Sequence, residues 1–172
     1  MKKLMMMFAA LLVGIAAQAA TCTWTLMNIK GPEGTSAQAG WAVYIMDSST
    51  YEVFNGLGAD QKASYASENK ALQTTVVNSR GFKVSFTGGD YSPMETVGTY
   101  LVLFNNADAS LATHYAVTGI QSKTIAEGGS NIALAFGNFA DATGGWQAVP
   151  EPTTGLLILL GMAGLALRRK QA

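Results

Sequence analysis

The stretch Thr21-Cys22-Thr23-Trp24-Thr25-Leu26 decides the fold class, because its side chains alternate strictly between two characters. Cys22, Trp24 and Leu26 fall on one side, and the three threonines fall on the other. Successive side chains of a β-strand point to opposite faces, so this alternation predicts a strand with one buried and one solvated face.

Further strand patterns follow along the chain, and they are of two kinds. Two runs, 41–46 and 100–104, are apolar on both faces, which predicts central strands that are covered on both sides. The others alternate, or are short and rich in aromatic or β-branched residues, and we expect strands at 51–54, 82–87, 114–118, 132–136 and 146–149.

Turn residues separate these runs, at 31–34, 88–90, 105–106, 128–129 and 144–145. One stretch breaks the strand pattern: residues 59–72 are rich in Ala, Lys, Glu and Gln, which predicts a single helix. Seven or eight strands with one short helix predict a mainly β fold, an antiparallel β-sandwich of the immunoglobulin-like or jelly-roll kind.

The N-terminus has the organisation of a secretory signal peptide. Lys2 and Lys3 precede an apolar stretch, and Ala17-Gln18-Ala19 provides the small-x-small pattern of a cleavage site. We expect signal peptidase to cut after Ala19, so that residues 1–19 are removed; a cut after Ala20 is the alternative. Thr21 directly before Cys22 does not fit a lipoprotein signal, so we do not expect lipidation.

The C-terminus combines three features in order: Val149-Pro150-Glu151-Pro152, an apolar run at 153–167, and the basic residues Arg168, Arg169 and Lys170. The two prolines favour an extended, accessible segment. As a helix the apolar run would span only about 22 Å, whereas a hydrocarbon core is roughly 30 Å thick. We therefore expect a marginal membrane helix that a processing enzyme can remove.

This tail resembles the PEP-CTERM sorting signal of Gram-negative bacteria that make exopolysaccharide. The resemblance covers Val149 to about Lys170, and the body matches no family that we recognise. It implies that a membrane-embedded exosortase recognises the Pro-Glu-Pro motif and processes the chain there. The domain organisation expected is a signal peptide (1–19), a β-rich exported domain (20–148) and a sorting signal (149–172).

Charge agrees with export. The chain has 11 basic and 11 acidic residues, and five of the basic ones flank the two apolar ends. The rest of the chain therefore carries a net charge of about −5. Basic flanks stay cytoplasmic, so the acidic body should be translocated across the inner membrane. An acidic body also argues against nucleic-acid binding, which needs a basic surface.

Residues for catalysis or metal binding are sparse. One histidine, His114, and one cysteine, Cys22, do not make a zinc site or a disulfide. Oxygen ligands cluster at 105–108, but without the alternating acids of a recognised calcium loop. We therefore expect no enzymatic activity and no cofactor.

The interpretation is an exported surface or extracellular-matrix protein that is held briefly in the membrane and processed by an exosortase. The alternative is a carbohydrate-binding module or adhesin in the exopolysaccharide matrix. Trp146 lies in a glycine-rich segment, so it is the aromatic side chain we expect to be exposed for contact with a glycan.

Overall fold

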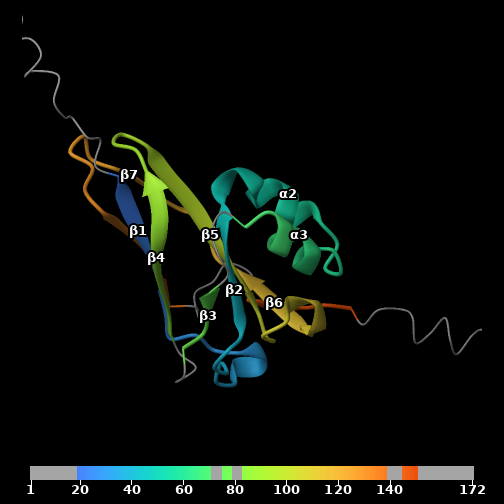
Figure 1. Cartoon of the computed structure of the whole chain (residues 1–172). Helices are drawn as coiled ribbons and strands as arrows, with labels where there is room; N and C mark the ends of the chain where they lie inside the picture. The colour runs from blue at the N-terminus through green and yellow to red at the C-terminus, as the bar shows by residue number, and fades with distance from the viewer. Residues whose placement is uncertain (1–18, 71–74, 79–82, 139–144, 151–172) are drawn as a thin grey trace, which may run out of the picture.

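The computed structural model describes residues 19–70, 75–78, 83–138 and 145–150. The segments predicted as signal peptide and membrane helix lie outside these residues, except for Ala19. The described chain forms three layers: a small sheet, a large sheet and a layer of short helices (Figure 1). Helices α2 and α3 lie on one side of the large sheet, and the small sheet lies on the other.

The small sheet has the strand order β4-β1-β8. Its central strand, β1 (Ala20–Met27), pairs antiparallel with β4 (Lys83–Tyr91) and parallel with β8 (Ile132–Asn138). Burial along β1 alternates as the sequence predicts: Cys22, Trp24 and Leu26 are fully buried, and the threonines between them are half-buried. Ile132 and Leu134 on β8 are likewise buried, which confirms the alternation predicted there.

The large sheet has the order β3-β2-β5-β6-β9, with β7 also paired to β5. Its strands are β2 (Ala42–Asp47), β3 (Thr75–Val76), β5 (Thr96–Phe104), β6 (His114–Val117), β7 (Gln121–Thr124) and β9 (Trp146–Ala148). The long strand β5 pairs with β7 near its start and with β6 near its end. All the pairings within this sheet are antiparallel.

The main core fills the space between the two sheets. The inward side of β1 packs there against Val43 and Ile45 of β2 and Leu101 and Leu103 of β5. Trp24 joins the two sheets, because its indole N–H donates a buried hydrogen bond of 2.8 Å to the hydroxyl of Thr99 on β5.

A second core covers the outer face of the large sheet. The alternate residues of β2 and β5, which include Tyr44 and Phe104, face α2 (Tyr51–Gly56) and α3 (Lys62–Glu68). We name this second group of side chains the outer cluster. β2 and β5 are therefore covered on both sides. This confirms the prediction of central, apolar strands at 41–46 and 100–104. Three short 3₁₀ helices, Pro32–Gly34 (η1), Ser48–Thr50 (η2) and Ala109–Leu111 (η3), connect the elements.

Two predictions for this region were wrong, namely a strand at 51–54 and the length of a helix over 59–72. Residues 51–54 form the start of helix α2 and not a strand. The helix predicted over 59–72 is shorter, since α3 ends at Glu68 and Lys70 makes a β-bridge to Met46.

The turn predicted at 88–90 is a β-bulge inside a continuous strand. Cys22 pairs with Gly88 and Ala20 pairs with Tyr91, so β4 holds one more residue than β1 between these pairs. Gly89 has a φ of +85°, and a Cβ added there would lie 2.1 Å from the ring of Tyr91. Glycine is required here by the bulge, which explains why the Gly-Gly pair looks like a turn in the sequence.

Two features of the sheets were not predicted. The parallel β1–β8 pair departs from the purely antiparallel sandwich that we expected. Strand β7 was missed because all four of its residues are exposed and carry no apolar alternation. The mainly β, two-sheet architecture itself agrees with the prediction, whereas the immunoglobulin-like or jelly-roll kind stays a prediction.

Candidate functional site

The candidate site is the C-terminal end of the described chain, at the edge strand β9. Within the described residues this strand pairs with β6 alone, with Trp146 opposite Ala116 and Ala148 opposite His114. The pairing continues one residue further, because the Val149 N–H donates a hydrogen bond of 2.8 Å to the carbonyl of Thr113. The predicted final strand at 146–149 is therefore confirmed, and Val149 belongs to the folded domain as well as to the predicted sorting signal.

Side chains of β9 are held on both faces of the large sheet. On the side of the main core, the Trp146 ring meets the Trp41 ring edge-on at 5.4 Å between centroids, and its indole N–H donates to the Lys30 carbonyl at 2.7 Å. On the other side, Gln147 accepts a hydrogen bond from the Tyr115 hydroxyl. These contacts fix β9 at the sheet edge although it is only three residues long.

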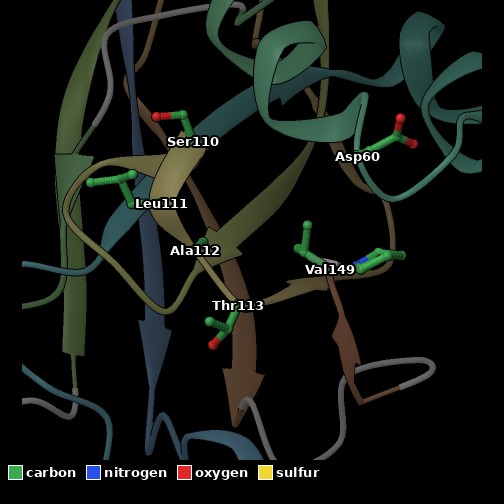
Figure 2. Close-up of a pocket in the computed structure, with 7 residues that line it drawn as sticks. Asp60, Ser110, Leu111, Ala112, Thr113 and Val149 are labelled. Carbon is green, nitrogen blue, oxygen red and sulfur yellow. The ribbon is translucent and has the colours of Figure 1, made fainter. Parts of the chain in front are cut away.

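A hollow of about 380 Å³ opens beside the end of the described chain (Figure 2). Val149 and Pro150, the first two residues of the predicted motif, form one side of it. The remaining lining comes from the η3 region and from the turn before α3: Asp60, Ser110, Leu111, Ala112 and Thr113. Val149 also packs against the outer cluster, so the start of the motif is in contact with the domain.

The other predicted sorting residues lie beyond Pro150. Glu151, Pro152, Arg168, Arg169 and Lys170 lie outside the described residues, as does Ala17 of the signal cleavage site. Ala19 is exposed and directly precedes β1, whose first residue, Ala20, is fully buried.

Trp146 is less exposed than we expected. It is half-buried, it packs against the main core, and its indole N–H is already hydrogen-bonded. These contacts give the ring a structural role at the strand edge, which the sequence did not indicate. Contact of Trp146 with a glycan stays a prediction.

The oxygen-rich loop at 105–108 uses its side chains to build turns. Asp108 accepts hydrogen bonds from the backbone N–H and the hydroxyl of Ser110, and these bonds lower the pKa of its carboxyl group. Asn105 accepts from the N–H groups of Thr113 and His114, each at 2.9 Å. Over the part of the chain that the structure describes, no three His, Cys, Asp or Glu side chains gather into a possible metal site.

Cys22 is completely buried between the sheets, and burial raises the pKa of its thiol to about 11. Because the thiolate is the reactive form, the native protein should resist alkylation at pH 8. We expect iodoacetamide to label Cys22 only as fast as the domain unfolds, and at once in 6 M guanidinium chloride. Mass spectrometry over time measures this; rapid labelling of the native protein would contradict the burial of Cys22.

Comparison with known proteins identifies the exit segment. The family model of the PEP-CTERM protein-sorting motif matches residues 148–170, so the chain carries this motif, as the tail predicted. No curated protein and no solved structure matches the chain. Among the helices of the described residues, none has the length and apolar character to span a bilayer.

The match begins at Ala148, which is also the last residue of β9. The sorting motif and the fold thus share residues. The partners that hold this shared segment, Thr113 opposite Val149 and His114 opposite Ala148, could not be found from the sequence, since both lie more than 30 positions away along the chain.

Proposed function

Since the chain carries a PEP-CTERM protein-sorting motif at 148–170, we propose that it is an exported surface or extracellular-matrix protein, processed at this motif by an exosortase. The observation that carries the proposal is the motif itself, which begins at Ala148, the last residue of strand β9. The basic residues after the apolar run support it, since they would stop that run at the cytoplasmic face.

The proposed route has four steps. The N-terminal signal directs export and is removed by signal peptidase after Ala19. The β-rich domain folds on the far side of the inner membrane, while the run at 153–167 holds the chain in the bilayer. The exosortase then cuts near Pro150-Glu151-Pro152, and the domain passes to the cell surface or the exopolysaccharide matrix.

We propose that the exported domain acts without catalysis. The side chains of Asn106 and Asp108 in the oxygen-rich loop accept hydrogen bonds from backbone N–H groups two residues further along the chain. The Nδ1 atom of His114 lies 3.1 Å from the hydroxyl oxygen of Thr113. The buried thiol of Cys22 is held in its unreactive form. These observations support a role in which the stable fold, and not a reactive group, is what is delivered.

The expected result of processing is a shortened C-terminus. Intact-mass spectrometry of the protein from its native host should show a chain that begins at Ala20 and lacks Arg168 to Ala172. A variant with Pro150→Ala and Pro152→Ala should keep its tail and stay in the membrane fraction. The matched control is Pro93→Ala, which changes a proline in the turn between β4 and β5, far from the motif along the chain. An intact tail on the wild-type protein would contradict the proposal.

A further inference from the structure

We propose that β9 is a release strand: the sorting motif becomes accessible to the processing enzyme only after β9 detaches from β6. The inference rests on the proposed function, because it concerns how the same motif is presented. It starts from the overlap at Ala148, which is the last residue of β9 and the first residue of the matched motif.

While β9 is paired, the start of the motif is engaged by the domain itself. The N–H of Val149 donates a hydrogen bond to the carbonyl of Thr113, and the Val149 side chain packs on the outer cluster. Pro150 lies against the η3 region, where it lines the hollow. Peptide-binding enzymes commonly take an extended segment through its backbone groups and alternate side chains. At Val149 the backbone N–H and the side chain are already occupied.

The length of free chain points the same way. Three residue steps separate Pro150 from residue 153, where the apolar run begins, and the greatest length that three steps can span is roughly 10 Å. Each polar interfacial layer of a bilayer is itself about 5–7 Å thick. With β9 paired, the domain must therefore lie against the membrane surface, directly over the bond to be cut. Releasing residues 146–149 lengthens the tether by about 14 Å.

β9 is built so that it can detach without unfolding the domain. It is a three-residue edge strand whose one neighbour in the part of the chain that the structure describes is β6, and Gln147 and Ala148 are exposed. The central strands β2 and β5, which join the two cores, do not pair with it. Short, exposed edge elements of this kind open at a small fraction of the free energy needed for global unfolding.

A disulfide between the two strands tests this inference. His114 and Ala148 face each other in the pair next to the hydrogen-bonded pair Thr113–Val149, so they form a non-hydrogen-bonded pair. In such pairs the Cα atoms lie about 4.5 Å apart, within the range of disulfides, about 4.4–6.8 Å. The full-length double variant His114→Cys and Ala148→Cys should therefore cross-link β9 to β6 after export.

Processing is followed by C-terminal mass and gel mobility, in cells that contain the native exosortase. We expect the cross-linked variant to accumulate with its tail intact, and a reductant added to the cells to restore the shortened form. The single variant His114→Cys should be processed like the wild type, and the same double variant kept reduced is the matched control for the change at Ala148, which lies in the matched motif. A non-reducing gel confirms the cross-link, and processing of the cross-linked form at the wild-type rate would overturn the inference.

A second variant tests the opposite direction. Trp146→Ala removes the ring contact with Trp41 and the hydrogen bond to Lys30, so β9 should detach more often and processing should be faster than in the wild type. A slower rate would count against the inference. If neither the wild type nor His114→Cys is ever shortened, the proposed function fails, which is a different outcome from a cross-linked double variant that is processed normally.

Discussion

Replacing Trp24 by alanine is expected to destabilise the exported domain by about 4 kcal/mol, the largest effect of any single change considered. Trp24 is fully buried at the centre of β1, where it packs near the rings of Phe86 and Tyr91. Alanine would leave a cavity between the two sheets and would also leave the Thr99 hydroxyl without its buried donor. Small domains are stable by only roughly 5–15 kcal/mol, so this single change would remove roughly a quarter to four fifths of the free energy of unfolding.

The measurement is chemical denaturation of the chain from Ala20 to Pro150, followed by tryptophan fluorescence and circular dichroism. Trp24→Phe is the matched variant, because it keeps an aromatic ring but removes the indole N–H. The unpaired Thr99 hydroxyl should then cost about 1–3 kcal/mol, and the added change Thr99→Val should recover part of that loss. A shift below about 1 kcal/mol for Trp24→Ala would mean that the sheets do not pack through this residue.

The strands that the sequence predicted correctly are those in which burial follows a short local period. In β1 and β8 every second residue faces the main core, so the pattern can be read without knowing the partner strands. The double-sided runs of β2 and β5 were also readable, since only strands covered on both faces remain apolar throughout. For these elements the local sequence and the tertiary fold agree.

Helix α2 shows how tertiary packing overrides a local preference. Tyr-Glu-Val-Phe at 51–54 has strand-forming residues, yet Phe54 is fully buried while Val53 is 54% exposed. Tyr51 and Phe54, three positions apart, both pack on the outer cluster, which is a helical spacing. The turn that starts this segment depends on Asp47, whose side chain accepts from the Ser49 N–H at 2.8 Å.

The pairing of strands could not be read from the sequence, because it joins residues far apart in the chain. The parallel pair β1–β8 places Cys22 beside Ile132, and nothing local to either strand indicates that direction. The candidate site divides in the same way. Its motif is local and was recognised. The pairing of β9 with β6, which we propose decides whether the motif is accessible, is not local and was not predicted.

Lys62 is expected to give the second largest effect, because it is a lysine that is only 4% exposed. Its ammonium group donates to the carbonyls of Phe54 and Asn55 at the end of α2, and it lies 4.4 Å from the centre of the Phe54 ring. Replacing Lys62 by alanine removes this cap and the packed hydrocarbon stem. We expect a loss of about 2–4 kcal/mol in the free energy of unfolding.

Lys62→Met is the matched variant, since it keeps much of the stem and removes only the charge. Burial lowers the pKa of Lys62 below its ordinary value of 10.5, so the folded state binds fewer protons than the unfolded state between the lowered pKa and 10.5. In that window the stability of the wild type relative to Lys62→Met should rise with pH, and below it the full cost of the buried charge remains.

The comparison between the two proteins isolates this contribution from the other groups that titrate at high pH. Burial raises the pKa of Cys22 to about 11 and that of Tyr100 to about 12, so these groups make stability fall as the unfolded chain loses their protons. Both proteins share that fall, and it cancels in the difference between their unfolding free energies from pH 7 to pH 10.5. A difference that stays flat over this range would show that the ammonium group of Lys62 is hydrated and not buried beneath α2.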